Sequence, residues 1–380
     1  MKKTLLAAAL LAGFAGAAQA ETSVTLYGII DTGIGYNKID LPGVGASDGY
    51  KHSRVGMING VQSGSRWGLR GTEDLGDGLR AVFTLESGFN SSNGDHAQDS
   101  RLFGRQATVG LASDAWGQLD FGRQTNIASK YFGSIDPFGL GFGAANMGVS
   151  FSAANTFRLD NLVLYQTPSF GGFQAGVGYS FSTDRQSSFN TADNVRAITA
   201  GVRYANGPLN VAVAFDQLNP AHNTDEDAKL RQYAIGGAYD FEVVKLALGY
   251  ARTEDGWFVT SHPGGFGDAV RAIAADNGVT PAPSVDGPAF RDGFRANSYM
   301  VGLTAPIGGA SSLFGSWQMV DPKNDKLTGD DEKMNIFSLG YTYDLSKRTN
   351  LYAYGSYAKN YAFIDDAKAT TVGVGLRHRF

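Results

Sequence analysis

Residues 124–157 read QTNIASKYFGSIDPFGLGFGAANMGVSFSAANTF. This stretch is rich in Gly, Ala, Ser, Asn and Phe, carries little charge, and separates two predicted strands at 117–123 and 158–167. It neither alternates like a strand nor keeps helical spacing for long. A loop of this length inside a compact domain is uncommon unless it is functional and packed by its own side chains. We therefore expect residues 124–157 to fold into a membrane β-barrel and narrow its channel.

The N-terminus has the three parts of a secretory signal peptide. Lys2 and Lys3 form a basic region, residues 5–12 are apolar, and Ala18-Gln19-Ala20 is a small-residue cleavage site. We expect residues 1–20 to be removed. Residues 21–380 are then expected to form a single transmembrane barrel.

Composition narrows the class of protein. Beyond residue 20 there is no apolar run of the roughly 20 residues that a spanning helix needs. The chain has no Cys, so an exported form has no disulfides to stabilise it. Without the two signal lysines, 30 basic residues stand against 36 acidic ones, a net charge of −6. This balance gives no electrostatic reason to expect a nucleic-acid partner. No linker or shift in composition divides the chain, which favours one all-β domain.

Strand-like alternation recurs along the whole mature chain. In residues 23–36, SVTLYGIIDTGIGY, one face is apolar and the other is mixed and small. Sixteen such segments are predicted, most of them 9–12 residues long, close to the span of a tilted transmembrane strand. They are 23–36, 65–73, 79–89, 101–112, 117–123, 158–167, 173–181, 194–204, 209–218, 230–240, 244–253, 295–305, 311–320, 333–344, 349–359 and 369–380.

The connections alternate between long and short. Short ones carry turn residues such as Asp77-Gly78 and Asn206-Gly207, whereas long ones include 37–64 and 254–294. An antiparallel outer-membrane barrel has this asymmetry, with short periplasmic turns and long external loops. A soluble β-sandwich also alternates, but its outward face is polar. In the last strand Val372, Val374 and Leu376 form a clean apolar face instead. Aromatic residues near the strand ends fit interfacial girdles; they are Tyr27, Tyr36, Trp67, Phe83, Phe89, Tyr341, Tyr343, Tyr352 and Tyr354.

Several blocks resemble the general porins of the Gram-negative outer membrane, and most closely their beta-proteobacterial branch. The blocks are SRWGLRGTEDLGDGLRAVFTLESGF, LFGRQATVGL, FGRQT and the C-terminal GVGLRHRF. The resemblance implies a homotrimer of 16-stranded barrels in the outer membrane, surrounded by lipid and lipopolysaccharide, with the third external loop folded inward. It also implies that Phe380 is part of the signal read by the barrel assembly machinery. An aromatic residue at a membrane interface is the alternative role for Phe380.

The same resemblance implies wall arginines that face acidic residues across the channel. The matching positions are Arg66, Arg105 and Arg158, with Glu86 as an acidic wall residue and Asp136 as the acid of the inward loop. Alternation places Arg66 and Glu86 opposite the apolar face. Alternation from Val109 and Leu111 would turn Arg105 outward, but a midplane arginine facing lipid would cost about 2–4 kcal/mol, so the channel is favoured.

Two of these charged positions need further comment. Arg123, which closes the strand before the long loop, is a further channel candidate. Asp136 also has an alternative role as an ordinary turn residue before Pro137. An excess of arginine over acid at the constriction predicts a mild anion preference for ions and small hydrophilic solutes.

Other functions find less support in the sequence. An enzyme would need a nucleophile or carboxylate pair with a positioned histidine, and none of the five His has a convincing partner motif. No metal-ligand spacing or cofactor motif is present. A substrate-specific channel with an aromatic slide, built from the phenylalanines of the 124–157 loop, or an adhesin with functional external loops, remains an alternative.

Overall fold

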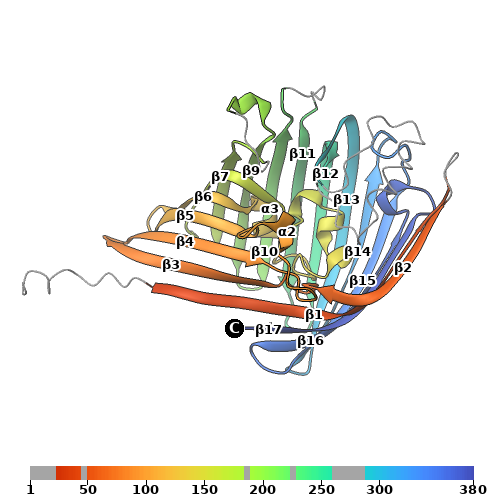
Figure 1. Cartoon of the computed structure of the whole chain (residues 1–380), viewed down its shortest axis with the longest axis horizontal. Helices are drawn as coiled ribbons and strands as arrows, with labels where there is room; N and C mark the ends of the chain where they lie inside the picture. The colour runs from red at the N-terminus through yellow and green to blue at the C-terminus, as the bar shows by residue number, and fades with distance from the viewer. Residues whose placement is uncertain (1–22, 44–48, 184–188, 223–227, 259–286) are drawn as a thin grey trace, which may run out of the picture.

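The computed structural model describes residues 23–43, 49–183, 189–222, 228–258 and 287–380 (Figure 1). The predicted signal peptide, residues 1–20, lies outside these ranges. The strands are β1 (Ser23–Leu41), β2 (Tyr50–Asn59), β3 (Arg66–Gly76), β4 (Leu79–Gly88), β5 (Gln106–Ser113), β6 (Gly117–Thr125), β7 (Arg158–Gln166), β8 (Phe173–Ser180), β9 (Arg196–Asn206), β10 (Leu209–Asn219), β11 (Leu230–Asp240), β12 (Lys245–Trp257), β13 (Ala289–Ile307), β14 (Ser311–Pro322), β15 (Met334–Asp344), β16 (Thr349–Lys359) and β17 (Lys368–Arg379).

Helical structure among the described residues is confined to short connecting pieces. They are α2 (Ala97–Ser100), α3 (Ile127–Phe132), η1 (Gly143–Ala145), η2 (Met147–Val149), η3 (Ser152–Ala154), η4 (Thr191–Asp193) and η5 (Tyr361–Phe363). None of the described helices is long and apolar enough to cross a membrane.

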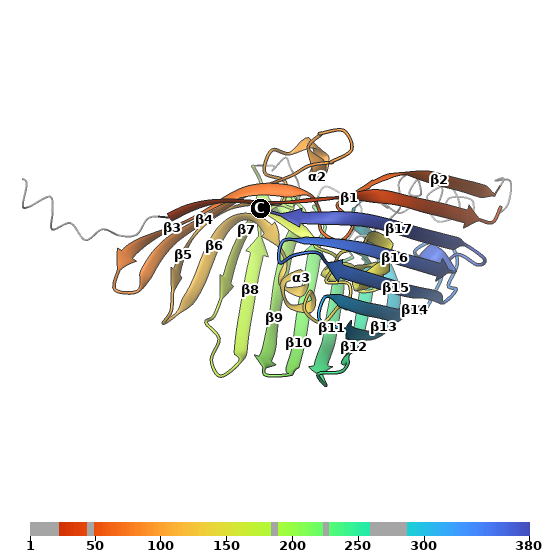
Figure 2. The same cartoon turned by 90° about the horizontal axis from the view of Figure 1, so that it is seen from below.

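The sheet closes on itself. From β3 onward each strand pairs antiparallel with the next, and β17 pairs with β1 from Ile29 opposite Arg379 to Asp40 opposite Lys368. Figures 1 and 2 both show β17 lying beside β1. The C-terminal Phe380 continues this pairing, since its backbone N–H and C=O both bond to Gly28. Closure joins the first and last barrel strands, as a barrel in lipid requires, whereas β2 is paired along one edge, with β1.

Sixteen barrel positions accommodate the seventeen strands. β2 pairs with the distal part of β1 and β3 with its first seven residues, so β2 and β3 together occupy one position. The predicted sixteen-stranded antiparallel barrel is therefore confirmed.

Three predicted boundaries are wrong. β1 runs on to Leu41, and β2 lies within residues 37–64, which were expected to be a loop. Polar residues on both sides of this extension hide the alternation. The strand expected at 101–112 begins only at Gln106. The expected 254–294 loop is shortened by β12 and β13, and its residues 259–286 lie outside the described ranges.

The two faces of the sheet differ as predicted. Val372, Val374 and Leu376 are between 41% and 55% exposed, as expected for residues that contact lipid. On β10, Val213 is exposed, whereas Ala212 and Ala214 on the opposite face are buried. We call the side with Ala212 and Ala214 the polar face, because it also holds most of the buried polar residues of the strands.

Residues 126–157, which we call the long loop, pack against the polar face from β8 to β16. Small residues on the wall make room for them. A Cβ at Gly236 would lie 2.9 Å from the Phe132 ring, and one at Gly302 would lie 2.4 Å from Cγ of Pro137. In Figure 2, α3 lies beside β9 and β10, with which it makes contact.

Hydrogen bonds fix the long loop at both ends of its path across the wall. Asn126 caps α3 and donates to Asp216 on β10 at 2.8 Å. Further along, the backbone oxygen of Ser150 accepts a bond from Ser298 on β13 at 2.6 Å, and its hydroxyl donates to Gln318 on β14. These buried polar contacts hold the loop in one position, because any shift would leave a buried donor or acceptor without a hydrogen bond and would lower the stability of the protein.

Aromatic residues fill the centre of the contact between loop and wall. The rings of Phe138 and Phe142 pack against Phe314, Tyr352 and Tyr354, with ring centroids 5.0–5.7 Å apart. The expectation that Tyr352 and Tyr354 belong to an interfacial girdle is therefore wrong, because both are buried under the long loop.

We expect Gly302→Val to displace the long loop, because the added carbons would overlap Pro137. Overpacking of this kind typically costs about 1–3 kcal/mol, and it should appear as a lower unfolding temperature and faster proteolysis of the loop. Gly355→Val is the matched control, because the nearest atoms to its added Cβ lie 3.8 Å away. Equal behaviour of the two variants would contradict this packing.

Candidate functional site: an arginine cluster on the polar face

Five strand ends bring the predicted charged residues together. Arg66 begins β3, Glu86 lies near the end of β4, Arg105 directly precedes β5, Arg123 lies near the end of β6, and Arg158 begins β7. In an antiparallel sheet, one strand ends at the edge where its neighbour begins. All five side chains therefore lie at one level of the barrel, where the long loop leaves the wall.

Glu86 is the first anionic centre of the cluster. Its Oε1 accepts a bond from Nε of Arg105 at 2.7 Å and lies 3.8 Å from the guanidinium of Arg66. Its Oε2 accepts from the hydroxyl of Tyr27 at 3.0 Å. Tyr27 therefore serves the cluster rather than an interfacial girdle, contrary to the expectation from sequence.

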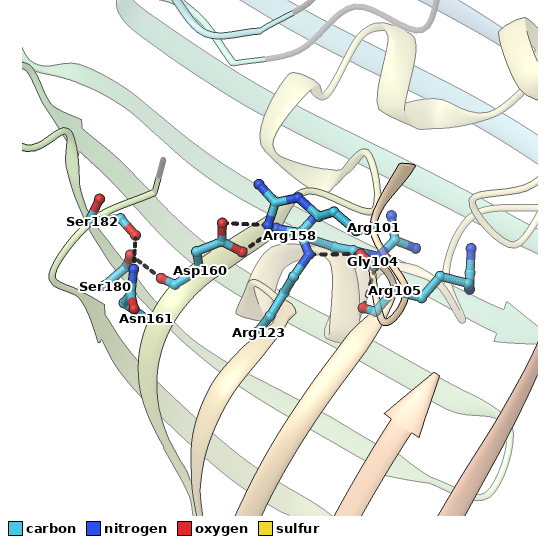
Figure 3. A network of polar contacts seen from close by, with 9 residues as sticks. All are labelled: Arg101, Gly104, Arg105, Arg123, Arg158, Asp160, Asn161, Ser180 and Ser182. Carbon is cyan, nitrogen blue, oxygen red and sulfur yellow. Dashed lines mark hydrogen bonds and ion pairs between the residues drawn. The ribbon is translucent and has the colours of Figure 1, made fainter. Parts of the chain in front are cut away.

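Asp160 is the second anionic centre, and sequence reasoning missed it. It receives bonds from Arg101 at 2.6 Å and from Arg123, as Figure 3 shows. The sequence could have predicted Asp160, because it follows Arg158 by two positions, and residues two positions apart in a strand lie on the same face. Arg101 was also missed as a member of the cluster.

Local irregularities turn two of the arginines onto the polar face. Phe121 is 46% exposed, so plain alternation would turn Arg123 outward as well. A register shift between Gly122 and Gln124, with φ of +119° at Gly122, reverses that direction. Arg105 lies in a bend before β5, so the alternation of Val109 does not extend to it.

Arg158 differs from its neighbours in having no carboxylate in reach. Its Nε donates to the backbone oxygen of Arg105 at 3.1 Å, and among the described residues no acid lies within 4.0 Å of its guanidinium. The cluster thus holds five guanidinium groups, those of Arg66, Arg101, Arg105, Arg123 and Arg158, against two carboxylates. A surplus of fixed positive charge at this level favours anions.

Asp136 lies elsewhere. Its buried carboxylate accepts the backbone N–H groups of Phe138, Leu140 and Met147 within the long loop. No arginine is among these partners, so the structure gives Asp136 the turn-forming role that was its alternative. The acids that pair with the arginines are Glu86 and Asp160, which lie on the same part of the wall.

The phenylalanines of the long loop do not form an exposed slide. Phe132, Phe138, Phe142 and Phe151 are each at most 3% exposed and pack against the wall. This finding contradicts the aromatic slide considered for a substrate-specific channel. Among the described residues, no group of three or more His, Cys, Asp or Glu side chains could hold a metal ion.

A closed barrel with an apolar outer face and a polar inner face that carries a cluster of charged side chains defines a diffusion channel of the outer membrane. The family profile of Gram-negative porins matches residues 7–362, and the chain belongs to that family. It is 69% identical, over the full length of both chains, to an outer membrane porin protein of Bordetella pertussis. The predicted resemblance to beta-proteobacterial porins is confirmed.

Solved structures agree with this assignment. An anion-selective porin from Comamonas acidovorans is 31% identical with a TM-score of 0.70, covering 95% of this chain and all of the other. OmpT of Vibrio cholerae in a trimer form is 16% identical with a TM-score of 0.58, covering 94% of this chain and 99% of that one, and shows the fold alone. The protein is an outer-membrane porin, and its relatives are channels rather than enzymes.

Asp136 should make the long loop sensitive to pH. Burial raises the pKa of this carboxyl from 3.8 to about 6. The folded loop then binds the proton more tightly than the unfolded chain, so the added stability is complete below pH 3.8 and is lost as the pH rises through about 6. The full effect is roughly 3 kcal/mol.

Hydrogen exchange at the amides of Phe138, Leu140 and Met147, corrected for intrinsic rates, should therefore slow as the pH falls through this window. Asp136→Asn should remove the dependence on pH. The same dependence in that variant would show that another group is responsible.

Proposed function

We propose that the long loop and the arginine cluster form the constriction of a general diffusion channel with a mild preference for anions. The surplus of guanidinium groups over carboxylates at one level of the wall carries this proposal. The loop narrows the channel from the β8–β16 side, and the arginines face it from β3–β7. The anion-selective porin of Comamonas acidovorans, which has a similar fold, supports the sign of the preference.

The constriction works by replacing part of the hydration of a passing ion. A narrow throat strips water from a solute, and fixed charges nearby offset that cost. Arg158, which has no acidic partner among the described residues, contributes a charge that no carboxylate cancels at short range. Arg66, Arg105, Arg101 and Arg123 share Glu86 and Asp160, so their field is partly cancelled at short range.

We also propose that the porin is a homotrimer in contact with lipid and lipopolysaccharide, and that it has no enzymatic activity. The signal peptide at residues 1–20 and the role of Phe380 in recognition by the barrel assembly machinery belong to the same proposal. The ring of Phe380 packs over Gly28, where a Cβ would lie 2.2 Å from its Cζ. Family membership supports the trimer, and a solved porin of the same fold occurs in a trimer form.

The first test is planar-bilayer conductance of the mature protein under a salt gradient. Wild-type protein should open in groups of three steps, with a reversal potential on the anion side. Arg158→Ser should move that potential towards zero more than Arg66→Ser, because Arg66 is already paired with Glu86. Arg348→Ser, an exposed arginine in the turn after β15, is the control and should change little. A cation preference in wild-type protein would overturn the charge assignment.

Neutralising the acids should have the opposite effect. Glu86→Gln and Asp160→Asn should each raise the preference for anions, because each removes one of two carboxylates that offset the arginines. The same reversal-potential measurement tests this. A shift towards cations in both variants would mean that these acids orient the arginines more than they cancel their charge.

A further inference from the structure

The connection between β2 and β3, which lies opposite β1 in the wall, is a second irregular segment. Thr32 pairs with Asn59 and Ile29 pairs with Arg66, so two residues of β1 stand opposite the six residues 60–65. We call residues 60–65 the wall bulge. Ile30 is 43% exposed and faces outward, whereas Asp31 is fully buried on the polar face, so the bulge forms on the polar side.

Asp31 holds the wall bulge through both its backbone and its side chain. Its carboxylate accepts the N–H of Ser63 and the hydroxyl of Tyr352, each at 2.7 Å. Its backbone oxygen accepts the N–H of Gly60 at 2.9 Å, and its N–H and oxygen both bond to the hydroxyl of Ser65. Both ends and the middle of the bulge are therefore tied to one residue of β1.

The wall bulge meets the tip of the long loop. The N–H of Phe142 donates to the backbone oxygen of Val61, and a side chain at Gly141 would overlap the oxygen of Gln62. Val61 packs against the aromatic cluster that contains Phe138 and Phe142. The loop tip thus rests between the wall on one side and the bulge on the other.

The wall bulge also contacts the arginines. The oxygen of Gly64 accepts Nε of Arg66 at 2.8 Å, and the hydroxyl of Ser63 accepts from Arg377 at 2.9 Å. A Cβ at Gly64 would lie 2.7 Å from a terminal nitrogen of Arg105. One six-residue segment therefore touches the loop tip and three guanidinium groups.

We propose that the wall bulge is a second constriction element, and that Asp31 is the positioning residue that holds it and thereby orients Arg66 and Arg377 towards the passing solute. This inference rests on the proposed channel function. It makes selectivity depend on a carboxylate that adds negative charge to the wall but favours anions through the geometry it imposes.

The sign of the effect of Asp31→Asn separates this positioning role from simple charge. Removing a negative charge alone would raise the anion preference. Loss of the fixed bulge should instead lower it, because Arg66 and Arg377 lose their fixed acceptors, and should increase open-channel noise. Tyr352→Phe should shift the reversal potential in the same direction without changing any charge.

Asp120→Asn is the matched control. It removes another buried carboxylate of the wall, and the bonds that Asp120 accepts come from Gln118 rather than from the bulge. It should show only the charge effect, a preference for anions that is unchanged or slightly higher. Heat-modifiable migration on gels confirms that each variant forms a folded barrel. A higher or unchanged anion preference in Asp31→Asn would overturn the proposal.

A cysteine test keeps the proposal falsifiable if Asp31→Asn fails to fold. The chain has no cysteine, so Gly64→Cys provides a single reactive thiol beside Arg105. Methanethiosulfonate reagents of similar size carrying a sulfonate or a trimethylammonium should lower conductance and shift the reversal potential in opposite directions. Ser346→Cys, in an exposed turn, should respond to neither reagent. No response at Gly64→Cys would place the bulge away from the ion path.

Failure of this inference differs from failure of the proposed function. If wild-type protein conducts and Arg158→Ser lowers its anion preference, while the Asp31 and Gly64 variants behave like wild type, only the second constriction element is lost. If folded wild-type protein forms no channel, the proposed function itself fails.

Discussion

The structure depends on one constraint, which is that every backbone N–H and C=O in the lipid needs a partner inside the protein. Pairing of β17 with β1 meets it for the barrel wall, because it joins the first and last strands of the sheet. Alternation of apolar and polar side chains along each strand then follows, because a closed wall has one face in lipid and one face around water. The exposed valines of β17 and the buried alanines of β10 are two results of the same closure.

A wall of sixteen strands encloses more space than its own side chains can fill. The long loop packs against the polar face of that wall, and small residues of the wall leave room for it. Glycines at positions 236, 249 and 302 lie under Phe132, Phe151 and Pro137, where any side chain would collide. Buried polar bonds from Asp216, Gln232 and Gln318 then select a single position for the loop. Packing of apolar side chains holds the loop against the wall, and the hydrogen bonds determine which loop residue lies beside which wall residue.

Alternation predicted all sixteen barrel positions, because burial in two different solvents leaves a period of two in the sequence. The prediction from alternation failed wherever the period of two residues is interrupted. β2 was missed because its distal part is polar on both sides. The direction of Arg123 depends on a bulge at Gly122, which shifts the period by one residue. Family resemblance brought Arg66, Arg105 and Arg158 to one cluster but missed Asp160, and Asp136 binds backbone N–H groups of its own loop instead of an arginine. The role of Asp31 could not be predicted from the sequence, because its hydrogen-bond partners Ser63 and Tyr352 lie 32 and 321 residues away along the chain.

The net charge of the chain and the anion preference proposed for its channel point in opposite directions, and distance explains why. Salt screens exposed charges beyond a Debye length of about 8 Å, so acids in the external loops act weakly on an ion at the proposed constriction. The arginines act at contact distance and in a narrow space, where water screens them less. Their field also depends on direction, because a guanidinium tied to Glu86 or to the wall bulge presents its charge at a fixed place. The preference of such a channel is therefore a property of a few oriented side chains and of the backbone irregularities that hold them.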